Sequence, residues 1–171
     1  MKTAEYWIQK LCLVRHPEGG YYREIYRLAE SIPKEALPDR YDGARAFSTS
    51  IFYLLPGNEV SYFHRLKSDE IWHFYQGSPV SLFVISATGD FNESILGPNF
   101  GSGQVLQAVI PAGHWLGAAV RARESYVLVG CTVAPGFDFH DFELGRRQEM
   151  LALFPQHQTI VLNLTKSPEP I

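Results

Sequence analysis

The feature that most constrains the fold is a series of short apolar segments between residues 47 and 133. Each is rich in aromatic and β-branched residues, and most are followed by a turn signal such as PGN, GSP or PAG. Strands of this kind at regular spacing predict an all-β sandwich or barrel. The expected strands are 47–55, 59–66, 69–76, 80–86, 104–110, 114–120 and 125–133.

The two ends of the chain have a different pattern. Residues 3–12 and 145–154 carry apolar residues at helical spacing, so each predicts a short helix. The polar, proline-containing stretch 30–45 predicts a loop with one helical turn. The tail 158–166 predicts a final strand or an extended arm. We therefore expect one domain over residues 1–171, a β barrel with short peripheral helices at both ends.

Composition excludes several classes of function. The chain is 46% hydrophobic and 19% charged, with a formal net charge of -3 and no cationic run, which argues against nucleic acid as a partner. No apolar stretch reaches the roughly 20 residues of a membrane span, and the N-terminus lacks the apolar region of a signal peptide. Cys12 and Cys131 lie in apolar surroundings and are expected to be buried free thiols. These features together predict a cytoplasmic protein.

The segment FHRLKSDEIWHFYQG (63–77) has the spacing of a metal site with one ligand missing. Residues two apart on a strand share a face, so His64 and Leu66 should lie side by side. Glu70 begins the next strand after a tight turn. A catalytic metal site usually needs three protein ligands, and leucine supplies none.

This segment resembles the first cupin motif, G-x5-H-x-H-x3,4-E-x6-G. The matching positions here, with six residues instead of five after the first glycine, are Gly57, His64, Leu66, Glu70 and Gly77. The second cupin motif, P-x-G-x2-H, is matched by Pro111, Gly113 and Leu116. Two of the four ligands of that superfamily, His64 and Glu70, are therefore present.

A closer resemblance is to the cupin family 5 proteins, a group long catalogued as a domain of unknown function. It is carried by HPEGGYYRE (16–24), by residues 49–77, by PAGHW (111–115) and by APGFDFHDFELG (134–145). The resemblance implies a double-stranded jelly roll, usually a homodimer, with a pocket inside the barrel. It implies no particular reaction. It also implies that leucine at positions 66 and 116 is the family's own pattern.

We predict that His64 and Glu70 are the catalytic pair, facing the barrel interior and sharing a hydrogen bond directly or through one water. A histidine changes charge near neutral pH, and a buried carboxylate needs a partner. The alternative is a structural role, in which Glu70 pairs with His64 or with an arginine such as Arg23. No cofactor is predicted. A divalent metal bound by His64 and Glu70 alone would be held weakly.

Further side chains are candidates for binding a ligand. They are Tyr21, Arg23, Ser50, Trp72, Phe74, His114 and Trp115. Arg23 could clamp an anionic group, and His114 should lie at the barrel mouth. The aromatic residues contact a ligand only if the barrel is hollow, and otherwise belong to the core.

The pattern leaves open which face of strand 21–27 lines the pocket. In 137–143, the phenylalanines are expected to anchor the segment and the acids to face water.

Three functions fit these residues. The first is a metal-free pocket for a small organic molecule, with proton transfer of the epimerase or isomerase type by His64. The second is a metal-dependent cupin enzyme, such as an oxygenase, decarboxylase or isomerase. The third is a ligand-binding or storage protein without catalysis.

Overall fold

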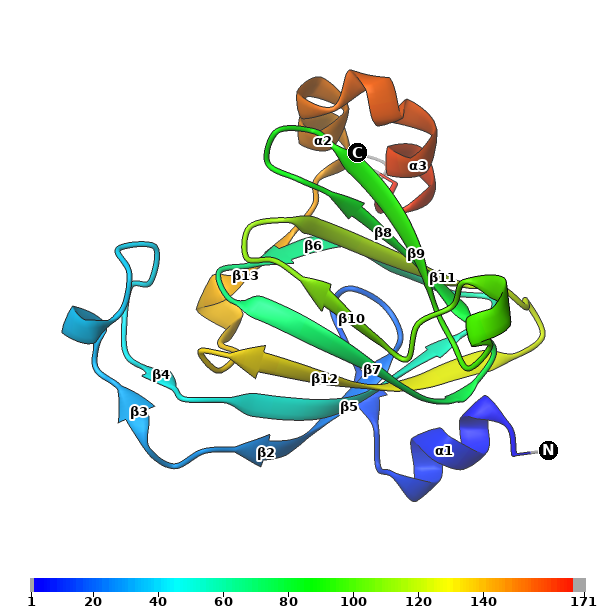
Figure 1. Cartoon of the computed structure of the whole chain (residues 1–171), viewed down its shortest axis with the longest axis horizontal. Helices are drawn as coiled ribbons and strands as arrows, with labels where there is room; N and C mark the ends of the chain where they lie inside the picture. Colours follow the sequence, from blue (N-terminus) through cyan, green and yellow to red (C-terminus); the bar gives the residue numbers. More distant parts are fainter. Residues whose placement is uncertain (1, 168–171) are drawn as a thin grey trace.

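The computed structural model describes residues 2–167, in which two antiparallel sheets face each other (Figure 1). The first sheet has the order β1-β2-β5-β12-β7-β10 and the second β13-β6-β11-β8-β9, while β3 and β4 form a separate pair. The strands are β1 (Val14–Arg15), β2 (Tyr21–Arg27), β3 (Ser31–Ile32), β4 (Arg45–Ala46), β5 (Thr49–Pro56), β6 (Val60–Leu66), β7 (Asp69–Gly77), β8 (Val80–Ile85), β9 (Phe91–Leu96), β10 (Gln107–Ile110), β11 (Trp115–Val120), β12 (Tyr126–Ala134) and β13 (Phe142–Leu144).

The expected strands are found as β5 to β8 and β10 to β12. Strand β9, which the sequence pattern does not predict, forms the edge of the second sheet beside β8. Its first three residues, Phe91 to Glu93, are all exposed, so it lacks the alternation of a half-buried strand. Pairing with β8 therefore determines this strand more than its own sequence does.

The core between the sheets follows the two-residue period of the strands. Val127, Val129 and Cys131 of β12 pack there against side chains such as Trp72 and Leu82. The residues between them on β12 include Leu128, which packs instead in a second cluster on the outer side of the sheet. Strand β12 is buried on both faces, which explains its almost uninterrupted apolar sequence.

The N-terminal helix α1 (Ala4–Lys10) covers the outer face of the first sheet (Figure 1). Thr3 caps the helix, since its side chain accepts a hydrogen bond from the backbone N–H of Tyr6. Trp7 packs against this face and donates a hydrogen bond from its indole Nε1 to the Tyr126 hydroxyl at 2.8 Å. The helix predicted for residues 3–12 is thus confirmed.

The C-terminal segment covers the outer face of the second sheet and corrects one prediction. Helix α2 (Arg147–Leu153) is followed by the 3₁₀ turn η4 (Pro155–His157) and by helix α3 (Gln158–Asn163). The tail is therefore not a strand or an arm. Val161 and Leu164, three residues apart, are buried with Phe63 and Trp115, and this packing favours a helix over a strand. No helix within residues 2–167 is both long and apolar enough to cross a membrane.

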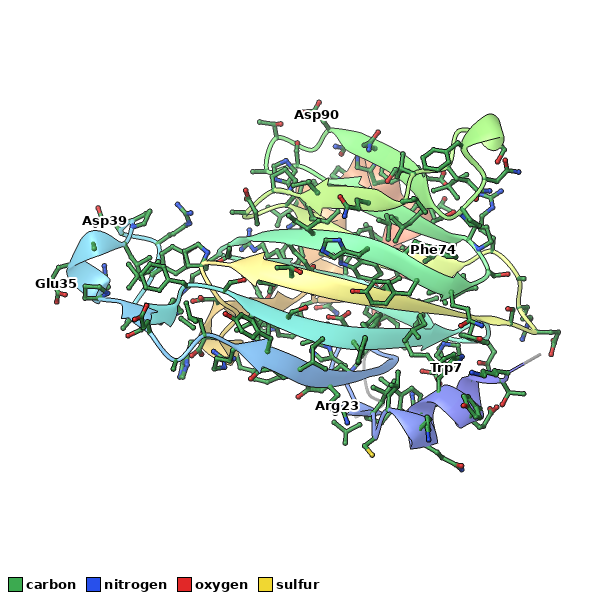
Figure 2. All side chains as sticks on the ribbon, turned by 60° about the horizontal axis from the view of Figure 1, so that its bottom comes forward. Trp7, Arg23, Glu35, Asp39, Phe74 and Asp90 are labelled. Atoms are coloured by element: carbon green, nitrogen blue, oxygen red, sulfur yellow. The ribbon has the colours of Figure 1, made fainter. Side chains whose placement is uncertain are left out.

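An arm formed by residues 28–46 projects from the sheets, with Glu35 and Asp39 near its tip (Figure 2). It contains β3, the 3₁₀ turn η1 (Lys34–Ala36) and β4. Arg45 at its base is buried and donates two hydrogen bonds of 2.6 Å to the buried carboxylate of Asp141. The sequence analysis expects Asp141 to face water, and the structure corrects this, because the carboxylate is buried and paired with Arg45.

Candidate functional site

A cavity of about 550 Å³ lies between the sheets, where β2, β5 and β12 face β6 and the 137–142 segment. Its wall combines aromatic and aliphatic side chains with about as many polar and ionisable ones. The lining residues are His16, Glu18, Tyr22, Glu24, Arg27, Thr49, Ile51, Tyr53, His64, Leu66, Glu70, Cys131, Val133, Phe137, Asp138, Phe139, His140 and Phe142. His64, Leu66 and Glu70 thus share the interior, as the strand alternation predicts.

The turn HPEGG (16–20) brings two ionisable side chains into this cavity. Gly19 has a φ of +109°, and a Cβ there would lie 2.3 Å from the carbonyl oxygen of Val60. Only glycine therefore lets the turn approach β6 so closely. The backbone carbonyl of Glu18 accepts a hydrogen bond of 2.8 Å from the N–H of Tyr62, which ties the turn to the strand that carries His64.

Glu18 is the centre of a buried cluster. One carboxylate oxygen lies 3.1 Å from Nδ1 of His16 and 3.4 Å from Nε2 of His64. The other oxygen accepts a hydrogen bond of 2.9 Å from the Ser61 hydroxyl. Burial raises the pKa of Glu18, but the charges of His64 and then His16 lower it more, and the pKa falls to about 2. Glu18 is therefore ionised at neutral pH.

His64 uses both ring nitrogens on protein atoms. Its Nδ1 lies 2.9 Å from the carbonyl oxygen of Tyr62, which can only accept, so this nitrogen carries a proton. Its Nε2 lies 3.4 Å from the Glu18 carboxylate, which is the distance of an ion pair. The geometry therefore favours an imidazolium–carboxylate pair, with the ring stacked on Phe142 at a centroid distance of 5.6 Å.

His16 has one ring nitrogen free. The Glu18 carboxylate lies 3.1 Å from Nδ1, and the backbone N–H of Glu18 approaches the same atom at 3.4 Å. The N–H of Glu18 donates to Nδ1, so in the neutral ring the proton is on Nε2. Within residues 2–167, Nε2 has no hydrogen-bond partner, and the ring lines the cavity beside Tyr22 and Phe139.

Glu70 also lines the cavity, but no direct hydrogen bond joins it to His64, which corrects that form of the predicted pair. The physical reason is that the 16–20 turn brings Glu18 to His64 instead. In the described part of the chain, the Glu70 carboxyl group makes no hydrogen bond or ion pair. Burial raises its pKa and the charge of Glu18 adds to this, whereas His64 and the neighbouring Trp72 indole lower it.

The two cysteines are free and have different surroundings. Cys131 is buried, and burial together with the charges of Glu70 and Glu18 raises the pKa of its thiol. It is therefore a poor nucleophile. Cys12 is exposed, so the expectation that both thiols are buried is wrong for this residue.

The face of β2 that lines the cavity is now determined. Tyr22 and Glu24 point into the cavity, and a β-bulge after Glu24 brings Arg27 to the same face. Tyr21 packs with the cluster under α1, and Arg23 is exposed on the outside of the sheet (Figure 2). Neither of these two predicted ligand-binding residues lines the cavity.

The other predicted ligand-binding residues also lie away from the cavity wall. Trp72 and Phe74 belong to the core between the sheets, and Trp115 belongs to the core under the C-terminal helices. The alternative expectation, that these aromatic residues are core, is what the structure shows. Ser50 alternates with two cavity-lining neighbours and faces away. His114 borders only a separate void of about 10 Å³.

Sequence reasoning missed the turn and the 137–142 segment as parts of the site. The sequence pattern assigns no site role to His16 and Glu18, although two ionisable residues beside paired glycines are a usable signal. Phe137, Phe139 and Phe142 had been assigned to anchoring, yet all three line the cavity. The aromatic alternation of that segment was visible, but nothing local showed which surface it would cover.

The residues at the cupin metal position do not fit a transition-metal ion. Leu116 pairs with His64 across β11 and β6, and Leu66 lies two residues further along the strand, so neither vacant position has a donor. The void that His64, Leu66, Glu70 and Leu116 border is about 10 Å³. No cluster of three or more histidine, cysteine or acidic residues between positions 2 and 167 is arranged to hold a metal.

Two facing antiparallel sheets with an internal cavity and short terminal helices define a cupin-type jelly roll. Comparison with known proteins gives the family. The chain belongs to the Cupin_5 family of the cupin superfamily, described as DUF985, which matches residues 5–145. The family assignment and the jelly roll expected from the sequence are thereby confirmed.

Three relatives in this family carry no stated activity. Protein SO0799 from Shewanella oneidensis is 36% identical with a TM-score of 0.89, covering 98% of this chain and 100% of its own. A hypothetical protein from Leishmania major is 33% identical with a TM-score of 0.88, covering 97% and 100%. The uncharacterized yeast protein YML079W is 29% identical over 138 residues, which are 75% of this chain and 68% of the yeast protein.

A more distant similarity concerns the fold alone. Oxalate decarboxylase from Bacillus subtilis has a TM-score of 0.54 at 15% identity, covering 91% of this chain and 37% of that chain. At this identity the similarity supports the cupin fold and no shared reaction. The comparisons as a whole indicate a cupin without a specific reaction.

Proposed function

We propose that the chain binds a small organic molecule in the cavity and catalyses a proton transfer on it, as an isomerase or epimerase. The observation that carries this proposal is the buried His16–Glu18–His64 cluster, which lines a cavity that also has aromatic walls. Ionisable groups with perturbed pKa values in an apolar pocket are the usual mark of a functional site.

The cavity supplies the two groups that a proton transfer needs. A histidine nitrogen that no protein atom occupies can exchange a proton with a ligand, and within residues 2–167 Nε2 of His16 is such a nitrogen. A second ionisable group is needed to receive or supply the other proton, and the Glu70 carboxyl group, whose pKa burial raises, lines the same cavity. A pair of groups whose surroundings push their protonation in opposite directions is suited to acid–base catalysis.

The size and walls of the cavity suit a small organic ligand. A volume of about 550 Å³ lies within the roughly 300–1,000 Å³ of ligand pockets. Tyr22, Phe139 and Phe142 offer aromatic surface against which a ring can stack. The same walls would serve a binding protein without catalysis, so the test has to separate the two functions. A metal-dependent reaction is not favoured, because only two of the four ligand positions carry donors.

The test uses deuterium to find a substrate whose identity is unknown. The full chain is incubated with a bacterial small-molecule extract in D₂O, and mass spectrometry follows compounds that gain one mass unit. We expect at least one compound to be labelled by the wild type and not by heat-inactivated protein. Ultrafiltration of the same mixture shows which compounds the protein retains.

The outcomes are distinct. A compound that is retained without labelling would assign the chain to non-catalytic binding and refute the catalytic part of the proposal. An extract in which nothing is labelled and nothing is retained would refute the cavity as a small-molecule site.

A further inference from the structure

We propose that the ligand of the cavity is a planar aromatic lactam, a ring compound in which a carbonyl oxygen lies next to an N–H group. His16 donates a hydrogen bond to the carbonyl oxygen, and Glu70 accepts one from the N–H. This inference rests on the proposed function and deepens it by naming the class of molecule that the cavity takes.

Two polar groups in the buried part of the cavity wall lack a protein partner. They are Nε2 of His16 and the carboxyl group of Glu70, and neither has a hydrogen-bond or ion-pair partner within residues 2–167. The His16 side chain is 6% exposed and Glu70 is 8% exposed. An unpaired buried polar group is costly, so a ligand has to offer each of them a partner. The buried polar side chains of the wall that already have protein partners are Glu18, Thr49, Tyr53 and His64.

Nε2 of His16 is a hydrogen-bond donor in both charge states of the ring. In the neutral ring, Nδ1 accepts from the backbone N–H of Glu18 at 3.4 Å, so the proton is on Nε2. In the charged ring both nitrogens carry protons, and Nδ1 faces the Glu18 carboxylate at 3.1 Å. The ligand must therefore present an acceptor to this nitrogen in either state.

The Glu70 carboxyl group is an acceptor in both of its charge states, because at least one oxygen keeps free lone pairs when the group is protonated. Burial raises its pKa, and the charges of the three cluster residues also act on it, so the carboxyl group lies close to the cluster. What it lacks is a donor. One small molecule that reaches both His16 and Glu70 therefore needs an acceptor and a donor close together, as in a cyclic amide.

The aromatic side chains around His16 favour a planar ligand. The ring of Phe139 lies at 25° to the imidazole with centroids 6.1 Å apart, whereas Tyr22 and Phe142 stand edge-on to it at 4.7 and 5.6 Å. A hydrogen bond from Nε2–H lies in the plane of the imidazole, and a carbonyl oxygen accepts best in its own plane. A flat ligand bound in this way extends nearly parallel to Phe139, where an aromatic ring can stack.

The other charged side chains of the wall are exposed and paired with one another. Arg27 donates to the Glu24 carboxylate at 3.0 and 2.7 Å, and Nδ1 of His140 lies 2.7 Å from Asp138. Solvated and already paired groups discriminate less between ligands than buried, unpaired ones do. The selection for a donor and an acceptor is therefore assigned to His16 and Glu70.

The experiment compares three probes of similar size on the wild type by NMR titration. Isocarbostyril is an aromatic lactam with both groups, N-methylisocarbostyril lacks the donor, and indole lacks the acceptor. We expect isocarbostyril to bind on the order of tenfold more tightly than either of the others, since each of these leaves one buried group unpaired. The imidazole Nε2–H signal of His16 should shift when isocarbostyril is added.

Two variants assign the contacts. In Glu70→Met the preference for isocarbostyril over its N-methyl form should fall to about one, and in His16→Phe the preference over indole should do the same. His73→Phe is the matched control, since His73 bonds to Thr132 and Gln107 outside the cavity and should keep both preferences. A folded variant that keeps the preference it is expected to lose would overturn the role of the residue replaced.

The remaining outcomes separate this inference from the proposed function. The probe series on the wild type needs no variant, and equal affinity for isocarbostyril and either analogue would overturn the donor–acceptor pair. Absence of isocarbostyril binding, in a protein that still retains some compound of the extract, would overturn the ligand class alone. Failure to retain any compound, probes included, would overturn the proposed function and this inference together.

Discussion

Replacing Glu18 by glutamine should destabilise the protein far more than the same change at Glu70. Glu18 has a pKa of about 2, against an ordinary value of 4.5. That difference corresponds to about 3 kcal/mol of stabilisation of the ionised form in the folded state. For a chain of this size, about 3 kcal/mol lowers Tm by roughly 6–12 °C. Removing the charge also leaves the His64 imidazolium without its counterion, which is the costly way to break a buried pair.

The pH dependence follows from the direction of the shift. The pKa of Glu18 is lower in the folded than in the unfolded state, so its contribution is complete above about pH 4.5 and is lost as the pH falls toward 2. Urea unfolding followed by circular dichroism should therefore show a large gap between wild type and Glu18→Gln at pH 7. The gap should be smaller at pH 3.

Glu70→Gln is the matched control, because its shift has the opposite sign. The raised pKa of Glu70 means that ionisation works against folding as the pH rises above the ordinary range, and glutamine removes this effect. We expect an unchanged or higher Tm at pH 7 together with weakened ligand binding or exchange. A loss of less than about 1 kcal/mol in Glu18→Gln, or an equal loss in both variants, would refute this account of the cluster.

Three further predictions concern the metal position, the arm and the oligomeric state. Elemental analysis of protein purified without chelator or a nickel column should find well below one equivalent of iron, manganese, zinc or nickel; one equivalent that is lost in His64→Ala would contradict this. Arg45→Met should cost about 3 kcal/mol in urea unfolding, because it leaves the buried carboxylate of Asp141 with only Lys67, whose Nζ lies 3.3 Å away; a loss below about 1 kcal/mol would show that the pair is dispensable. Light scattering should give a homodimer, twice the 19.3 kDa chain. Ile25→Glu should yield a monomer, because exposed Ile25 and Tyr26 lie where the edge of β2 away from β5 is no longer paired with β1; a monomeric wild type at micromolar concentration would refute the dimer.

Local pattern was sufficient wherever burial on one side of an element produced a regular period. The alternation of β6 and β7 placed His64, Leu66 and Glu70 on the interior face, and the structure has them on one cavity wall. The absence of donors at positions 66 and 116 is a property of residue type alone. The same reasoning was insufficient for the tail, because IVLNL is apolar enough for a strand or a helix and only its contacts with Phe63 and Trp115 choose between them.

The sequence by itself determined the sheet-rich fold, the interior position of His64 and Glu70, and the lack of a full metal-ligand set, because each depends on spacing within one strand or on the residue present. Tertiary structure alone decided the partner of His64, since Glu18 lies 46 positions earlier in the chain and reaches it only because Gly19 lets the 16–20 turn pack against β6. It also decided that Arg27 joins Glu24 on the cavity side, since a bulge shifts the alternation there by one residue. Contacts between distant segments carry no local period, and so the centre of the candidate site became visible only in the folded chain.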